Sequence, residues 1–303
     1  MALKNLLRIC RRFLCLLLPG LLLPGLAAAE TRAVIIAGLG GEADYEEEFQ
    51  RHANRLGEAL ADVTEDVVLL TGEAATQTAV EGALDAMAGR SSSDDTLLFV
   101  FIGHGSYDGE RFKFNVPGPD FSAAALGDWL DPIPSRTQLL VVTGAASGAV
   151  LDVLGAPERT LITGTRSGDQ RNATVFGRYF TAALEDAAAD VDKDGRVTAQ
   201  EAFNFASDGV VRHYDQDGEM ATENPVTSGP EPGMILARLD AAPTVNAADA
   251  HLIARRDELE QDIATLRAEK ARFTQDEYFA QLQKLLLEMA MIESQLSSAG
   301  ETP

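Results

Sequence analysis

Two short polar turns, each following an apolar run, hold the residues of this chain that could do chemistry. The first apolar run, residues 96–102, ends in residues 103–106 (GHGS), and the second, residues 138–142, ends in residues 143–148 (TGAASG). Short apolar runs bounded by Gly and Ser predict buried parallel strands. Functional side chains of an open α/β sheet follow the carboxyl ends of such strands. We therefore expect the two turns to lie side by side.

The chemistry that these turns suggest is nucleophilic catalysis by a Cys-His dyad. His104 on the first turn could act as a general base, and a thiol on the second turn would be the nucleophile. The second turn has Ala145 at its centre and contains no cysteine. The sequence therefore supplies the base without the nucleophile.

The first 29 residues have the pattern of a secretory signal peptide. A basic start is followed by an apolar stretch over residues 13–26, and Ala27-Ala28-Ala29 provides a small-residue cleavage site before Glu30. An uncleaved membrane anchor is the alternative, but two prolines interrupt the apolar stretch, which is short for a membrane span. The basic residues are Lys4, Arg8, Arg11 and Arg12.

Cleavage after Ala29 would leave a mature chain without any thiol. Both cysteines of the 303-residue chain, Cys10 and Cys15, belong to the leader, so neither a disulfide nor a cysteine nucleophile is possible in the mature protein. Removal of four basic and no acidic residues takes the formal net charge from −22 to −26. This charge argues against nucleic acid and anionic membranes as partners. We expect an exported protein, periplasmic or extracellular, with no integral membrane segment after cleavage.

The order of these motifs resembles the caspase–legumain clan of cysteine peptidases, and the legumain type most closely. That clan has a strand ending in His-Gly, then a strand ending in an acid, a small residue, Cys, any residue and Ser-Gly. Residues 103–105 fit the first part, and residues 143–148 fit the second in register, with Thr143 at the acid position and Ala145 at the nucleophile position. The resemblance continues through residues 160–166, 176–180 and 201–203, and covers about residues 33–229.

The resemblance implies a caspase-like three-layer α/β/α sandwich with a mostly parallel sheet over residues 30–229. It implies that His104, Gly105 and residue 145 mark the catalytic position, with the amides of Gly105 and residue 145 as a candidate oxyanion hole. Gly40, in a glycine-rich loop, would border the substrate cleft. The polar loop with Asp169, Arg171 and Asn172 would either recognise a charged or amide side chain or simply be solvated.

The hydrophobic pattern by itself predicts elements that fit such a sheet. Apolar runs predict five strands alternating with helices, which favours a mostly parallel sheet covered on both faces. The predicted strands are 33–37, 66–70, 96–102, 138–142 and 159–163, and the predicted helices are 45–63, 76–88, 121–130, 149–154 and 174–186.

A second candidate site is the acidic segment 190–201, which matches the EF-hand loop at every required position. Asp190, Asp192 and Asp194 would supply carboxylates at loop positions 1, 3 and 5, and Gly195 would permit the sharp turn. Expected further ligands are the Arg196 carbonyl, Thr198 and a bidentate Glu201. The segment predicts one Ca²⁺ site, and the alternative is an acidic, solvated turn between helices. Residues 215–219 look like a shorter partial second loop.

The end of the chain predicts a separate helical unit. Residues 230–247 form a Pro- and Ala-rich linker, with a possible edge strand over residues 234–237. Residues 248–298 contain two amphipathic stretches separated at Thr274, which predicts a helical hairpin or short coiled coil. Such a hairpin could pack on itself, or could provide self-association or docking to a partner.

Three functional hypotheses follow. The first is a non-catalytic pseudopeptidase that binds a peptide or protein, or serves as a scaffold, in the cell envelope. The second is an active peptidase with a different nucleophile, for which Ser147 is the nearest hydroxyl. The third is a calcium-stabilised adaptor that works through the tail hairpin.

Overall fold

The computed structural model describes residues 29–230 and 233–239, and in the tail residues 255, 259, 262, 263, 266 and 270–299. All of the predicted leader except Ala29 lies outside the described residues, as does most of the predicted linker.

A six-stranded sheet in the order β10-β8-β7-β3-β1-β2 forms the centre of the fold. Five of its strands are parallel, and β10 pairs antiparallel with β8 at one edge. The strands are β1 (Thr31–Ala37), β2 (Asp66–Leu70), β3 (Thr96–Ile102), β7 (Thr137–Val142), β8 (Arg159–Thr163) and β10 (Val226–Ser228). The mostly parallel α/β sheet predicted from the apolar runs is therefore confirmed.

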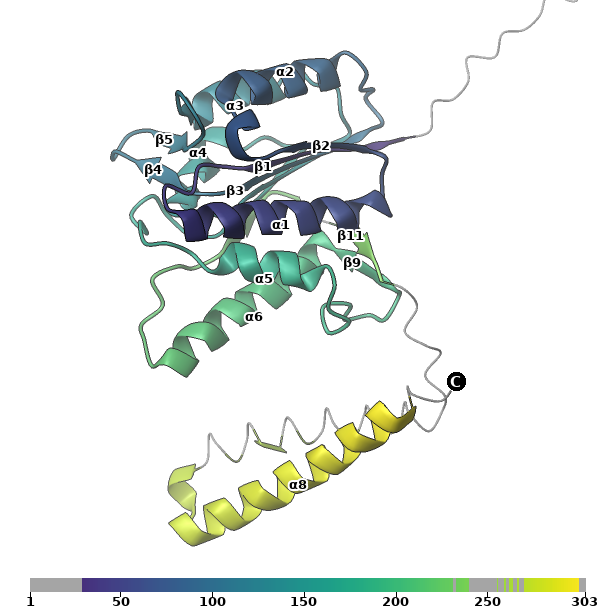
Figure 1. Ribbon diagram of the computed structural model, residues 1–303, viewed down its shortest axis with the longest axis vertical. Helices are drawn as coiled ribbons and strands as arrows, with labels where there is room; N and C mark the ends of the chain where they lie inside the picture. The colour runs from purple at the N-terminus through teal and green to yellow at the C-terminus, as the bar shows by residue number, and fades with distance from the viewer. Residues whose placement is uncertain are drawn as a thin grey trace, which may run out of the picture.

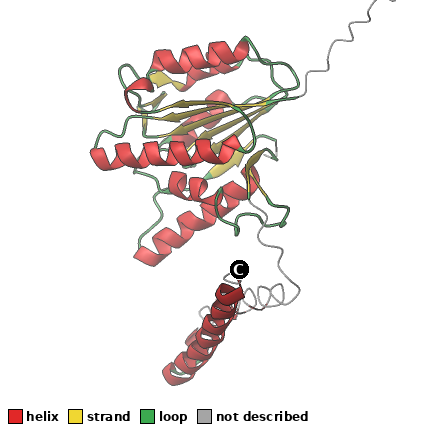
Figure 2. Ribbon diagram, turned by 45° about the vertical axis from the view of Figure 1, so that its right-hand side comes forward, coloured by secondary structure: helices red, strands yellow, loops and turns green. Residues whose placement is uncertain are grey.

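Helices cover both faces of this sheet and give a three-layer α/β/α arrangement (Figures 1 and 2). One face packs against α1, α5 and α6, and the other against α2, α3 and α4, so the sheet separates two apolar cores. The helices are α1 (Ala43–Ala61), α2 (Gln77–Ala88), α3 (Ala123–Leu130), α4 (Leu151–Leu154), α5 (Phe176–Ala183) and α6 (Ala199–Asp217).

A small antiparallel sheet follows His104 and covers one end of the main sheet. It consists of β4 (Gly105–Tyr107), β5 (Phe112–Phe114) and β6 (Phe121–Ser122) in that order. The alternation of apolar and polar residues over 111–115 predicts the central strand. In the structure Phe112 and Phe114 are buried, and Lys113 between them is exposed. Phe114 stacks on Phe121 with ring centroids 4.7 Å apart, and this contact joins the outer strand to the ribbon.

Two segments of the second half of the domain have positions that the sequence pattern leaves open. The strand expected near residue 235, β11 (Ile235–Arg238), pairs with β9 (Arg196–Thr198) and does not join the main sheet. Residues 215–219 do not form a partial metal loop. They are the end of α6, which stops at Gly218 in the left-handed conformation that favours glycine (φ 68°).

The described part of the tail consists mainly of α8 (Gln275–Ala299), preceded by a 3-10 turn at Lys270–Arg272. Thr274 caps the helix: its hydroxyl accepts from the Glu277 amide at 3.4 Å, and the Glu277 carboxylate accepts from the Thr274 amide at 3.0 Å. Arg255, which is helical, donates to Glu288 of α8 at 2.9 Å, the kind of contact expected within a helical hairpin. Among the described residues, no helix combines the length and hydrophobicity needed to cross a membrane.

Candidate functional site

The two polar turns are in direct backbone contact at the carboxyl ends of β3 and β7. These strands pair in parallel with Phe101 opposite Val142, so their following residues emerge at the same edge. A Cβ atom placed on Gly144 would lie only 1.9 Å from the Gly103 carbonyl oxygen, and one on Gly105 would lie 2.7 Å from the Ala145 carbonyl oxygen. Glycine at these positions therefore lets the two backbones meet.

The imidazole of His104 is directed toward α1. Its ring makes edge-on contacts with Tyr45 and Phe49, at centroid distances of 4.9 and 5.0 Å. Burial lowers the pKa of His104, although a backbone hydrogen bond to Gly40 and the nearby Glu42 charge act in the opposite direction. His104 is therefore mainly neutral at pH 7 and able to accept a proton.

A small cavity of about 20 Å³ lies beside His104, between α1 and the start of α5. Thr143, at the position where the clan has an acid, lines the same cavity, as does the buried His52. This volume is close to what one water molecule needs and is far too small for a peptide side chain. A bound peptide would have to lie on the outer surface of the two turns.

Ala145, the residue that the sequence resemblance aligns with the nucleophile, is only 5 % exposed. The next residue, Ala146, adopts a left-handed conformation (φ 57°) and donates its amide to the Gln170 carbonyl at 2.7 Å. The turn after β7 thus has a backbone conformation that is uncommon for a residue other than glycine.

Ser147 does not provide a substitute nucleophile. Its side chain is fully buried, and its hydroxyl oxygen accepts a hydrogen bond from the Thr165 amide at 3.1 Å and lies 3.2 Å from the Thr165 hydroxyl. These contacts join the second turn to the segment after β8. Because a substrate carbonyl cannot reach this hydroxyl, the structure argues against the Ser147 peptidase.

The predicted recognition loop lies beside the Ala145 turn. Gln170 anchors it: the carbonyl accepts from Ala146, and the side-chain amide donates to the Thr222 carbonyl at 3.1 Å and to Asn224 at 3.0 Å. The three residues singled out for substrate recognition, Asp169, Arg171 and Asn172, are exposed on this loop.

Gly40, which the resemblance places at the border of a substrate cleft, lies between β1 and α1. It is buried against the first turn of α1, where its amide donates to the Glu46 carboxylate at 2.9 Å and an added Cβ would lie 2.4 Å from the Glu46 amide nitrogen. Gly40 is thus in contact with the first turn of α1 and, through its backbone, with His104.

The acidic loop brings together part of the expected ligand set. Carboxylate oxygens of Asp190, Asp192 and Asp194 all lie within 4.8 Å of one another. Asp190 is buried, and its oxygens also accept from the amides of Asp194 and Gly195, at 3.1 and 3.0 Å. Gly195 has φ 79°, which explains why the loop needs glycine there.

The remaining expected ligands lie around this cluster rather than in it. Glu201 forms a capping box with Thr198 at the start of α6, and its other carboxylate oxygen accepts from the Val191 amide at 2.9 Å. Its carboxylate thus connects the beginning of the loop to its end, and these hydrogen bonds outweigh burial to lower the pKa of Glu201. Arg196 is exposed in β9, which pairs with β11.

Sequence patterns did not indicate Glu223, a buried carboxylate next to the site. It accepts from the amides of Val175 and Phe176 at 2.7 and 3.1 Å, and so satisfies the amino-terminal end of α5. Burial raises the pKa of Glu223 despite these bonds. The residue lies far in sequence from the helix that it caps and belongs to no local motif, so only the fold places it there.

Comparisons with known proteins find a likeness to solved structures. No family model matches the chain, and no curated protein matches it. A solved structure described as "structure of pro-sf-caspase-1" is similar over 67 % of this chain and 92 % of its own chain, with a TM-score of 0.47 and 9 % sequence identity. The likeness concerns the fold, and the site described above rests on the residues of this chain.

Proposed function

We propose that this chain is an exported, non-catalytic protein of the cell envelope that binds a peptide or another protein at the two-turn edge of its α/β domain. The observation that carries the proposal is the pair of apposed turns in which His104 is kept while Ala145 occupies the nucleophile position. Without a thiolate there is no acyl-enzyme, because a base alone cannot form the covalent bond.

The exposed loop beside Ala145 supports a binding role. Asp169 and Arg171 present opposite charges, and Asn172 presents an amide, next to a backbone that is fixed by the Gln170 contacts. A fixed backbone with free polar side chains suits recognition of a polar or charged peptide segment, since little conformational freedom is lost on binding. Exchange of both charges, as Asp169→Lys and Arg171→Glu together, should change which peptides bind.

We further propose that the acidic loop binds one Ca²⁺ ion that stabilises the domain. Three carboxylates within 4.8 Å repel one another, and an oxygen-only donor set is the kind that Ca²⁺ prefers. Gly195 of the loop has a left-handed backbone conformation, and the end of the loop forms β9, which pairs with β11. The loop backbone therefore has a defined conformation before any ion binds.

Reinstalling a thiol tests the non-catalytic proposal. The unmutated chain beginning at Glu30 should hydrolyse no peptide, whereas Ala145→Cys should react with a thiol-directed peptide electrophile. Ser106→Cys is the matched control, because Ser106 is exposed on the His104 turn but lies outside the nucleophile position. We expect Ala145→Cys to react at least about ten-fold faster than Ser106→Cys, and to lose most of that advantage with His104→Ala.

Two results would overturn the proposal. One is hydrolysis by the unmutated chain that His104→Ala abolishes, because the turn would then be catalytic as it stands. The other is equal reactivity of the two engineered cysteines, which would show that the dyad geometry is absent and that the two turns are not a peptidase-derived cleft.

A further inference from the structure

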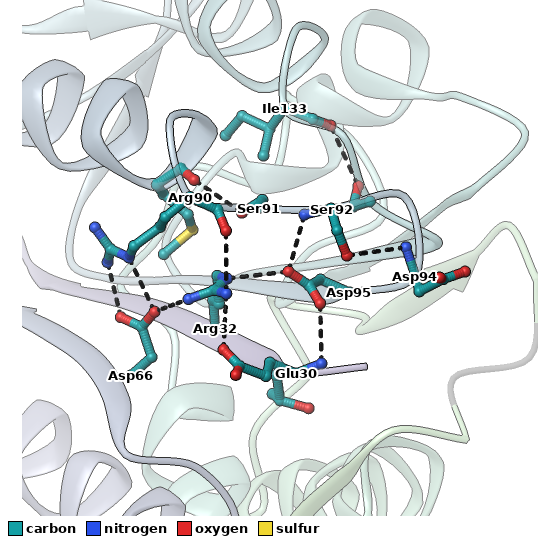
Figure 3. Close-up of polar contacts among 12 residues, drawn as sticks. Glu30, Arg32, Asp66, Arg90, Ser91, Ser92, Asp94, Asp95 and Ile133 are labelled. Carbon is teal, nitrogen blue, oxygen red and sulfur yellow. Dashed lines mark hydrogen bonds and ion pairs between the residues drawn. The ribbon is translucent and has the colours of Figure 1, made fainter. Parts of the chain in front are cut away.

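A network of charged side chains lies at the amino-terminal edge of the sheet, opposite the edge with His104. Arg32 on β1 is its centre and contacts Asp66, Asp95 and Glu30 (Figure 3). Arg90 binds Asp66 through two hydrogen bonds of 2.7 and 3.0 Å. The strands β1, β2 and β3 all begin within this network, so it fixes their ends relative to one another.

Glu30, the first residue after the predicted cleavage site, is held by three contacts of different kinds. Its amide nitrogen donates to Asp95 at 2.9 Å, and its carbonyl accepts from the Thr96 amide at 2.8 Å. Its carboxylate pairs with Arg32 at 2.7 Å. Ala29, directly before it, is exposed. Glu30, the first residue of the predicted mature chain, is therefore bonded to the domain through its amide, its carbonyl and its carboxylate.

The network lacks one positive charge. Glu30, Asp66 and Asp95 contribute three carboxylates, whereas Arg32 and Arg90 contribute two guanidinium groups, which leaves one net negative charge. Asp95 is 3 % exposed. Burial acts to raise the pKa of Asp95, but hydrogen bonds from the amides of Glu30 and Ser92 and from Arg32 outweigh it and lower that pKa to about 2. Asp95 is therefore ionised at neutral pH.

We propose that removal of residues 1–29 creates an α-ammonium group on Glu30 that binds the buried Asp95 carboxylate and locks the start of β1. The proposal rests on the proposed export of the chain. Hydrolysis of the Ala29–Glu30 peptide bond by a secretory signal peptidase consumes one water. It leaves a carboxylate on Ala29 and an amine on Glu30, which takes up a proton.

The nitrogen atom that becomes the ammonium already lies at hydrogen-bond distance from Asp95. Cleavage therefore converts a hydrogen bond of 2.9 Å between a neutral amide and the Asp95 carboxylate into an ion pair between an ammonium and that carboxylate, and it makes the network neutral. The desolvation free energy of the buried Asp95 carboxylate is already incurred before cleavage, so the new ammonium mainly offsets that unfavourable term. Other charged residues near Asp95 are its chain neighbour Asp94 and Arg136, whose backbone amide donates to the Asp95 carbonyl at 2.7 Å; both are exposed and present in both forms of the chain compared below.

Two forms of the chain, which differ only at the amino terminus and both extend to residue 303, test the proposal. One begins at Glu30 and the other at Ala27, both released from a removable tag that leaves no extra residue. In the longer chain the amine lies up to about 10 Å from Asp95, and Glu30 keeps only its neutral amide. We expect the chain beginning at Glu30 to melt about 2–6 °C higher at pH 6 to 7.

The pH dependence of the difference in melting temperature shows whether the Glu30 ammonium causes that difference. An ammonium paired with Asp95 has a folded-state pKa above its unfolded value of about 8. Its contribution is then complete below pH 8 and disappears as pH rises through the folded-state pKa. Arg32, Asp66, Arg90 and the Glu30 carboxylate are present in both chains, so their titration cancels in the difference. Equal melting temperatures at pH 6 to 7, or a difference that persists at pH 11, would overturn the proposal.

Substitutions of the two carboxylates show which of them binds the Glu30 ammonium. Asp95→Asn should abolish the difference between the two chains, while Asp66→Asn, a matched carboxylate of the same network that does not touch the Glu30 amide, should keep it. If Asp95→Asn does not fold, the pH experiment on the unmutated chains decides.

The position of cleavage is tested separately: the intact mass of exported protein should correspond to a start at Glu30. A different start would refute the maturation step even if the charged pair forms in vitro, and it would leave the peptide-binding proposal unaffected.

Discussion

Two histidines near the same small cavity show how burial controls the charge of single residues in this fold. His104 is half-buried between aromatic rings of α1, and His52, also on α1, is 4 % exposed. Burial lowers the pKa of both groups, and for His52 the positive charges of Arg51, Arg55 and Arg178 lower it further, to about 4. The neutral imidazole of His104 is the form that a general base requires.

His52 should make the domain sensitive to acid. Its folded-state pKa of about 4 lies below the ordinary value of 6.5, so between these values the unfolded chain binds a proton that the folded chain does not. Stability is therefore lost as pH falls from 6.5 to 4, by up to about 3 kcal/mol. His52→Gln cannot titrate and should reduce that loss, as measured by urea denaturation at pH 7.5 and pH 4.5. An equal effect of the substitution at both pH values would instead indicate packing alone.

For single residues, the sequence predicts where a side chain lies on the sheet better than it predicts whether that side chain is buried and what it contacts. The apposition of the turns carrying His104 and Ala145 follows from two apolar runs, because parallel strands end at the same edge. The burial of Ser147 depends on Thr165, which arrives from a different strand, and no local pattern indicates it. For the same reason Glu223, which caps α5 from 47 residues further along the chain, could not be found by sequence reasoning.

Among the elements, α6 depends most visibly on the acidic loop. Thr198 and Glu201 form the capping box that starts the helix, and Glu201 also binds the Val191 amide at the start of the loop. The loop and the first turn of α6 thus share one carboxylate. Any ion that binds the loop carboxylates would therefore also affect the beginning of this helix.

Calcium should raise the melting temperature of the domain. A ligand that binds only the folded state stabilises it by about 2.7 kcal/mol at a free concentration 100 times its Kd. Glu201→Gln should abolish the increase but leave α6 intact, because glutamine can also complete a capping box. Asp215→Asn, at the other end of α6, is the matched control and should keep the increase. Thermal melting with and without millimolar Ca²⁺ measures both, and an unshifted unmutated chain would refute the site.

The long apolar strands were predictable and the short polar ones were not. Runs such as residues 96–102 are buried on both faces and carry an unambiguous pattern. By contrast, β9 and β10 have three residues each, and their side chains are mostly polar, so they form only where a neighbouring strand offers partners. The pairing of β11 with β9 depends on the fold of the acidic loop, so the sequence predicts the strand but not its partner.

The molecule as a whole consists of the α/β domain and a helical tail with its own described contacts. Arg255 pairs with Glu288, and Leu259, Tyr278 and Ile292 are buried. Phe279, Leu287 and Met291 of α8 are exposed. A helical segment with both a buried and an exposed apolar set has enough apolar surface for a further contact, in line with the predicted role in self-association or docking.

Deletion of residues 240–303 should leave the melting temperature of the α/β domain within about 2 °C of the full-length value. The reason is that the two apolar cores on the faces of the main sheet are built from residues 33–239. Differential scanning calorimetry checks the melting temperature, and size-exclusion chromatography with light scattering compares the mass of both forms. A drop of 10 °C or more would show that the tail is an integral part of the domain.

The pairing of β11 with β9 also determines where a mechanical load on the tail would enter the domain. Any pull from the carboxyl-terminal side reaches β11 first, at Leu239, whose amide is bonded to the Gly195 carbonyl of the acidic loop. Because β11 pairs with β9 and not with the main sheet, such a load reaches the β9–β11 hydrogen bonds before it reaches the six-stranded sheet. The acidic loop between α5 and α6 is thus the first part of the domain to bear tension from the tail.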